Sequence, residues 1–159
     1  MFILEKKYAD EMIAHAREES PNEACGLLAG HQGKVVKVYR CENTLKSPYR
    51  YDINPLNFLR ADQEMEEKGW ELLGIYHSHT KTEAYPSMTD IQFADAFRET
   101  TLALLSIFGA SSPSQEDLAS LYPGPLYFIV SLADPKGPAI RAFRIVGGKV
   151  TEERIRIEE

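Results

Sequence analysis

Cysteine and histidine are both scarce in this sequence. The 159 residues include two cysteines, Cys25 and Cys41, and four histidines. Because the cysteines have no C-x-x-C spacing, they indicate neither a disulfide framework nor a thiolate zinc site. Both are expected to be small buried thiols. Cys25 lies two residues from Glu23, so a redox role for it stays open.

Long apolar runs and an excess of positive charge are also missing. No stretch approaches the roughly 18 apolar residues of a transmembrane helix. The segment MFILEKKYAD has too short an apolar run, and acidic residues too early, for a secretory signal. With 18 basic against 24 acidic residues, the net charge of −6 disfavours nucleic acid as the main partner. These features predict a cytoplasmic protein without a membrane or nucleic-acid partner.

The sequence does contain enough apolar residues for one domain spanning residues 1–159. Its hydrophobic content of 43% and charged content of 26% are ordinary for a soluble globule. Periodicity and turn residues predict the α/β class, with helices interleaved with a mixed sheet. The expected helices are 5–19, 55–68 and one after Ser87, and the expected strands are 26–30, 35–39, 49–53, 70–76, 126–133, 139–146 and 149–157.

Residues 100–121 give the least regular pattern in the chain. The apolar run TLALLSIFGA is followed by the polar run SSPSQED. The first part is expected to continue the core as a helix or strand. The second is expected to be a loop-like insertion, with a role as a lid or a partner surface left open.

The stretch from Ile75 to Asp90, IYHSHTKTEAYPSMTD, contains the densest set of reactive side chains. His77 and His79 follow an apolar strand-like run, and residues two apart in a strand point to the same face. Two histidines and one carboxylate, with a fourth position for water, form a catalytic zinc set. The pattern therefore predicts that His77, His79 and Asp90 bind Zn²⁺.

Two structural interpretations of the same residues stay open. The histidines could be surface or packing residues. Ser87 and Asp90, three residues apart after a proline, have the spacing of a capping box at a helix start. A first-turn aspartate can still point toward a metal, so capping and metal binding do not exclude one another.

His77-Ser78-His79 followed by Ser87 and Asp90 resembles the motif of the JAMM (MPN-plus, or JAB1/MPN/Mov34) metalloprotease family. Upstream, the segment Pro21-Asn22-Glu23-Ala24-Cys25-Gly26-Leu27-Leu28 has the form of the family segment that carries an essential glutamate, and Glu23 occupies its place. The resemblance spans about residues 2–157. It implies a cytidine-deaminase-like α/β domain, with a curved mixed sheet and helices packed on it.

The resemblance also implies a reaction. A JAMM enzyme hydrolyses a peptide or isopeptide bond after the C-terminal glycine of a ubiquitin-like protein. Glu23 would be the general base and then the general acid, and the Ser87 hydroxyl would stabilise the oxyanion. A Gly-Gly tail can add to a sheet edge as an extended strand. Residues 49–53 and 81–85 are the candidates for its channel.

Within the family, the string YHSHTKTEAYPSMTD is similar to bacterial hydrolases that release cysteine from a sulfur-carrier protein. The expected substrate is therefore a carrier–cysteine adduct. An isopeptidase that removes a ubiquitin-like modifier from lysine and a non-catalytic MPN scaffold are the alternatives. A nucleobase deaminase needs H-x-E and P-C-x-x-C, and neither motif is present. The sequence leaves open whether the protein forms a homo-oligomer.

Overall fold

A computed structural model describes residues 1–108 and 124–159 of the chain. The helices and strands follow one another from the N-terminus as β1 (Phe2–Glu5), α1 (Lys6–Glu19), β2 (Cys25–His31), β3 (Lys34–Cys41), α2 (Pro55–Lys68), β4 (Glu71–His79), α3 (Met88–Phe108), β5 (Leu126–Ser131), β6 (Ala139–Val146), β7 (Lys149–Glu153) and β8 (Ile155–Glu158).

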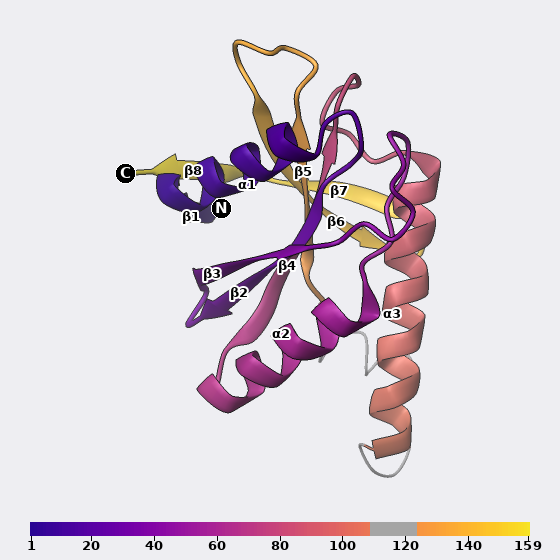
Figure 1. Ribbon diagram of the computed structural model, residues 1–159. Coiled ribbons are helices and arrows are strands. Elements are labelled where there is room, and N and C mark those ends of the chain that lie inside the picture. The colour runs from indigo at the N-terminus through magenta and orange to yellow at the C-terminus, as the bar shows by residue number, and fades with distance from the viewer. Residues whose placement is uncertain (109–123) are drawn as a thin grey trace.

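The centre of the fold is a six-stranded mixed sheet with the strand order β3-β2-β4-β5-β6-β7 (Figure 1). Only the β4–β5 pair is parallel among these neighbours, and α3 lies in the connection between its two strands. The other neighbouring pairs are antiparallel. Strands β1 and β8 form a separate parallel pair. The predicted α/β class with a mixed sheet is confirmed.

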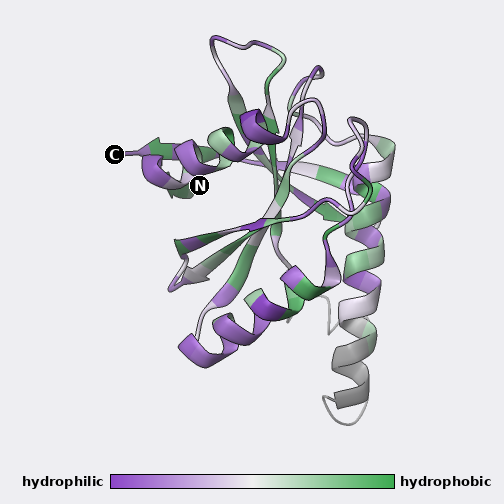
Figure 2. Cartoon of the chain, in the orientation of Figure 1, coloured by the Kyte–Doolittle hydropathy of each residue, from purple (hydrophilic) through white to green (hydrophobic). Residues whose placement is uncertain are grey.

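The sheet buries an apolar layer on each of its faces. Leu28 and Tyr76 pack with the buried face of α1, whereas Leu27 and Ile75 pack with α2 and α3 on the opposite face. This alternation follows from the strand geometry, which sends successive side chains to opposite faces. Figure 2 shows the resulting green interior strands and the predominantly purple outer sides of α1 and α2.

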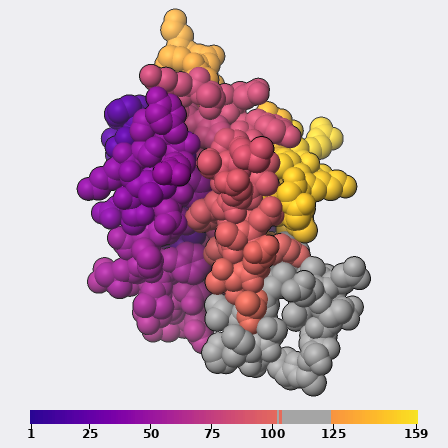
Figure 3. All heavy atoms as spheres, turned by 90° about the vertical axis from the view of Figure 1, so that its right-hand side faces the viewer, coloured from indigo at the N-terminus to yellow at the C-terminus, as the bar shows by residue number. Residues whose placement is uncertain are grey.

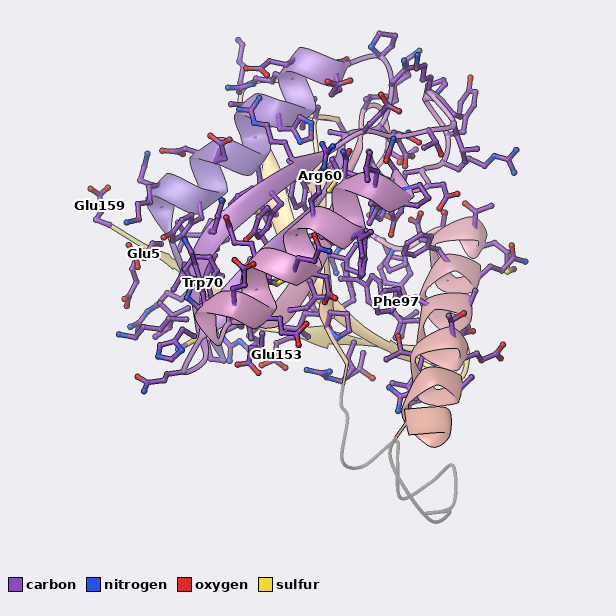
Figure 4. The ribbon with its side chains drawn as sticks, turned by 60° about the horizontal axis from the view of Figure 1, so that its bottom comes forward. Glu5, Arg60, Trp70, Phe97, Glu153 and Glu159 are labelled. Carbon is purple, nitrogen blue, oxygen red and sulfur yellow. The ribbon has the colours of Figure 1, made fainter. Side chains whose placement is uncertain are left out.

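Helix α3 lies between the N-terminal and C-terminal segments on one side of the molecule (Figure 3). Its Phe97 faces α2 (Figure 4), where the ring centroids of Phe58 and Phe97 are 5.9 Å apart. Helix α2 has the ends that the sequence predicts. The Asn54 side chain accepts hydrogen bonds from the backbone N–H groups of Leu56 and Asn57, and Gly69 ends the helix in a left-handed conformation.

The prediction of a strand at residues 49–53 is wrong. This segment is a loop, and it contributes one isolated bridge, between Asn43 and Ile53. Tyr51 and Ile53 are buried, but Tyr49 is 80% exposed. The alternating pattern therefore reflects a loop that buries two side chains.

Residues 100–108 complete α3, and residues 109–121 of the expected insertion lie outside the described residues. Within the described part, no helix has both the length and the hydropathy needed to cross a membrane.

Candidate functional site

Three buried donor atoms meet at the end of β4. His77 and His79 are two residues apart on this strand, and Asp90 is in the first turn of α3. Asp90 Oδ2 lies 3.0 Å from the Nε2 atom of each histidine, and the two Nε2 atoms are 3.1 Å apart. All three residues are at most 5% exposed. They form a group that could hold a metal ion.

The spacing of these atoms fits a small metal ion. Zinc bonds of 2.0–2.1 Å in a tetrahedral site place neighbouring ligand atoms about 3.3 Å apart. The observed triangle is a few tenths of an ångström tighter, so small side-chain shifts would accommodate the ion. The His79 Nδ1 atom lies 2.8 Å from the Glu83 carbonyl oxygen. Donation of the Nδ1–H to this carbonyl would leave the Nε2 lone pair able to bind a metal ion, the usual arrangement at metal-bound histidines.

His77 is held by packing. Tyr51 stacks on its ring with a centroid distance of 4.4 Å and an interplanar angle of 17°. Within the described part of the chain, the buried His77 Nδ1 has no hydrogen-bond partner. Burial lowers the pKa of His77, which favours the neutral imidazole needed for metal binding. For His79, burial also opposes the charged form, but hydrogen bonds to Asp90 and Glu83 raise its pKa overall.

Asp90 is both a potential ligand and part of a helix cap. The Ser87 N–H donates to Asp90 Oδ2 at 2.9 Å, and the Asp90 N–H donates to Ser87 Oγ at 3.2 Å. This reciprocal pair is the capping box that the sequence allowed. Burial alone would raise the pKa of Asp90, but its hydrogen bonds with the two histidines and Ser87 hold it well below its usual range. The carboxylate is therefore ionised.

Glu23 lies beside the donor cluster, between the end of α1 and the start of β2. Its side chain is 3% exposed, and its Oε1 atom has no partner among the described residues. Burial raises the pKa of the Glu23 carboxyl to about 8, and the negative charge of Asp90 adds to the shift. A carboxyl group with such a pKa is suited to proton transfer near neutral pH.

A pocket of about 260 Å³ opens beside these groups, although His77 and Asp90 are not among its lining residues. The expected site residues Glu23, His79 and Ser87 all line it. Its walls come from the end of α1, the loop before α2 and the loop after β4, through Pro21, Pro48, Tyr49, Thr80, Lys81 and Thr82. Parts of both expected channel segments, 49–53 and 81–85, thus reach the pocket, although the first is not a strand.

The match to known proteins agrees with this geometry. The family described as prokaryotic homologs of the JAB domain matches residues 5–107. The chain belongs to the JAB family. A solved structure from Desulfitobacterium hafniense is 34% identical and covers all of this chain and 94% of its own, with a TM-score of 0.74. A JAB1/MPN domain protein from Archaeoglobus fulgidus, 16% identical over all of this chain and 97% of its own, has a TM-score of 0.55 and supports the fold.

Several curated JAB relatives have names that describe hydrolysis. The CysO-cysteine peptidase of Mycobacterium tuberculosis is 32% identical over all of this chain and 92% of its own length. The probable TtuB-protein conjugate cleaving protease of Thermus thermophilus is 42% identical over 54% of this chain and 57% of its own. The desampylase of Pyrococcus furiosus is 37% identical over 44% of this chain and 50% of its own length. The chain is thus related to hydrolases.

Sequence reasoning assigned no role to two residues that position the site. The Ser78 side chain, between the two histidines, accepts a hydrogen bond from the Ala24 N–H at 2.7 Å and so joins the Glu23 segment to β4. Asn43 is 8% exposed and donates to the Glu23 carbonyl oxygen at 3.1 Å. A buried polar side chain requires such partners, but the sequence does not show which partners it has.

Cys25 is near the site but is not arranged as a reactive thiol. It lies opposite His77 in the β2–β4 register, and both cysteines are buried and free. Burial raises the pKa of each thiol far above its usual range. Since the thiolate is the reactive form, this environment disfavours oxidation and metal binding by either cysteine.

The donor cluster predicts that a divalent metal ion stabilises the folded protein. At a free metal concentration 100 times the Kd, binding adds about 2.7 kcal/mol to the free energy of unfolding. Replacing His77, His79 or Asp90 with Ala should abolish this gain in a thermal melt with and without metal. His31→Ala, at an exposed histidine, is the control and should keep it. An undiminished gain in all three cluster variants would contradict the assignment.

Proposed function

We propose that this protein is a zinc-dependent hydrolase that cuts the amide after the C-terminal glycine of a ubiquitin-like sulfur-carrier protein and releases cysteine. One observation carries the proposal. Three converging donor atoms lie beside a buried carboxylate whose Oε1 atom has no hydrogen-bond partner among the described residues, and a pocket lined by Glu23, His79 and Ser87 opens beside them. The likeness to the CysO-cysteine peptidase over the whole chain supports the choice of substrate.

Each site residue has a distinct task in this reaction. His77, His79 and Asp90 would hold the zinc ion, which when bound would supply the Lewis acidity that activates water and polarises the scissile carbonyl. Glu23 accepts a proton from the attacking water at its carboxylate. It then donates this proton to the leaving amide nitrogen, so that the carboxylate is regenerated.

In the proposed reaction, Ser87 stabilises the oxyanion that develops on the scissile carbonyl. As the helix cap, its oxygen accepts the Asp90 N–H. The hydroxyl hydrogen therefore remains available to donate, either to Thr89 Oγ1 at 3.0 Å or into the pocket that Ser87 lines. A donor fixed in this way needs little rearrangement during the reaction.

An isopeptidase acting on lysine-linked conjugates is the second candidate. The likeness to the TtuB-conjugate protease and to the desampylase favours it, although each covers only about half of this chain. The two reactions share the carrier tail and differ in the leaving group. For cysteine this group is a single amino acid, which suits a pocket of about 260 Å³.

The proposed acid–base role makes Glu23→Gln a direct test. Glutamine keeps the shape of the side chain but cannot accept the proton. The variant should therefore retain zinc and substrate affinity while kcat falls about 10²–10⁴-fold. Zinc content by elemental analysis and steady-state kinetics measure the two effects. Unchanged kcat would assign the base to another residue, and loss of zinc would make Glu23 a ligand.

Two substitutions separate the catalytic and capping roles of Ser87. Ser87→Ala should lower the free energy of unfolding by about 1 kcal/mol, whereas Ser87→Gly should lower it by only a few tenths. Both remove the hydroxyl and should reduce kcat about 10²–10³-fold. Ser87→Thr, which keeps a hydroxyl, is the control. If the Gly variant turns over at the wild-type rate, Ser87 acts only as a cap.

The substrate is tested with one carrier bearing two different leaving groups. The zinc-loaded protein is incubated with a carrier–Gly-Gly–cysteine adduct and with the same carrier linked to a lysine side chain, and the products are identified by mass spectrometry. We expect faster release of cysteine. If the isopeptide is cut at least as fast, cysteine release is the wrong assignment, whereas a failure to cut either substrate contradicts the proposed hydrolase activity.

A further inference from the structure

No hydrogen bond within the described part of the chain fixes the Oε1 atom of the Glu23 carboxylate, which is buried. A general base must nevertheless lie within hydrogen-bond reach of the proton that it removes. The place of this carboxylate therefore depends on packing and on the backbone that carries the side chain.

The backbone of Glu23 is bonded on both sides to the loop between β3 and α2. Its N–H donates to the Ser47 carbonyl oxygen at 2.9 Å. Its carbonyl oxygen accepts a hydrogen bond from Asn43 Nδ2 at 3.1 Å. The next residue, Ala24, is bonded to Ser78 of β4 through two hydrogen bonds, at 2.7 and 3.0 Å. The Glu23 segment is thus held between the loop and the strand that carries the histidines.

The Asn43 side chain holds this loop together from the inside. Besides the Glu23 carbonyl, its Nδ2 atom donates to the carbonyl oxygen of Arg50 at 3.1 Å. Its Oδ1 atom accepts the N–H groups of Leu45 and Asp52, each at 3.1 Å. These four bonds use both donor hydrogens and both acceptor sites of the amide. Because Asn43 is only 8% exposed, hydrogen bonds to water cannot easily replace these four bonds.

The same loop also supplies other parts of the site. Pro48 and Tyr49 form a wall of the pocket, and Tyr51 stacks on His77. Asn43 therefore connects the carboxylate, the pocket wall and the packing behind one of the ligand histidines. A shift of about 1 Å in such a framework can reduce turnover about 10²-fold.

We infer that Asn43 is a positioning residue for Glu23. Through its amide it fixes the Glu23 backbone and the loop of residues 44–53 as one unit relative to β4. This inference rests on the proposed function for its catalytic consequence. Its structural basis is the four hydrogen bonds of the Asn43 side chain.

Asn43→Asp is the most direct test because aspartate has nearly the same shape as asparagine. It keeps an oxygen toward Leu45 and Asp52 but places a second oxygen against the carbonyls of Glu23 and Arg50, so both donor bonds are lost. Near neutral pH we expect kcat to fall about 10²-fold, with KM changed less than threefold and the zinc content unchanged. Thr44→Val is the matched control. It removes another side-chain bond in this loop, from Thr44 to the Asp52 carbonyl, and should keep the wild-type kcat.

A double-mutant cycle distinguishes positioning of Glu23 from a general structural effect. Residues that act as a unit in catalysis have strongly non-additive effects on kcat. Asn43→Asp should therefore cause little further loss of kcat when it is added to Glu23→Gln. Equal fold-losses in the two backgrounds, or wild-type kcat in folded Asn43→Asp, would overturn the inference. If Asn43→Asp does not fold, Asn43→Ser, which keeps one shorter donor, is used in the same cycle.

A spectroscopic measurement tests the inference independently of turnover. The ¹³C chemical shift of the Glu23 carboxyl group, assigned by comparison with Glu23→Gln, should change in Asn43→Asp. It should be the same in Thr44→Val as in the wild-type protein. An unchanged resonance in the Asn43 variant would overturn the positioning role. If the wild-type protein cuts no carrier adduct but the resonance shifts, the proposed function fails while the positioning of Glu23 by Asn43 stands.

Discussion

The close approach of three electron-rich atoms at the end of β4 is the constraint on which the rest of the site depends. Two imidazole nitrogens and a carboxylate oxygen lie within 3.1 Å of one another and are almost fully buried. Removing such groups from water is unfavourable unless they are paired with hydrogen or with a positive charge. A cation at their centre satisfies all three at once. The surrounding fold can therefore be understood as the framework that keeps these atoms together.

Two ordinary elements of secondary structure provide that framework. The period of a β-strand places His77 and His79 on one face of β4, and β4 is paired along both of its edges, with β2 and with β5. The start of α3 brings in Asp90, whose carboxylate caps the same helix through Ser87. The apolar packing of α3 against the sheet thus sets the position of the charged Asp90 side chain.

The sequence was informative where function coincides with a local pattern. The spacing of His77 and His79 was enough to predict a shared face, and the dual use of Asp90 could be anticipated from the capping motif. Glu23 had no local signal and was predicted only through the resemblance to the JAMM family. Asn43 was missed because its four partners are spread over the chain, from Glu23 to Asp52. The loop at residues 49–53 was assigned wrongly because two buried side chains that alternate with exposed ones imitate a strand.

The parallel pairing of β4 with β5 has a consequence for biosynthesis. Glu23, the histidines and Asp90 have all been synthesised long before β5 (Leu126–Ser131), yet β4 lacks its parallel neighbour until then. The Ser131 hydroxyl also donates to the Thr82 carbonyl oxygen at 2.6 Å and so fixes the loop that follows the histidines. A chain still emerging from the ribosome therefore carries every reactive group without their final arrangement. The complete arrangement of the site therefore forms only after β5 has been synthesised.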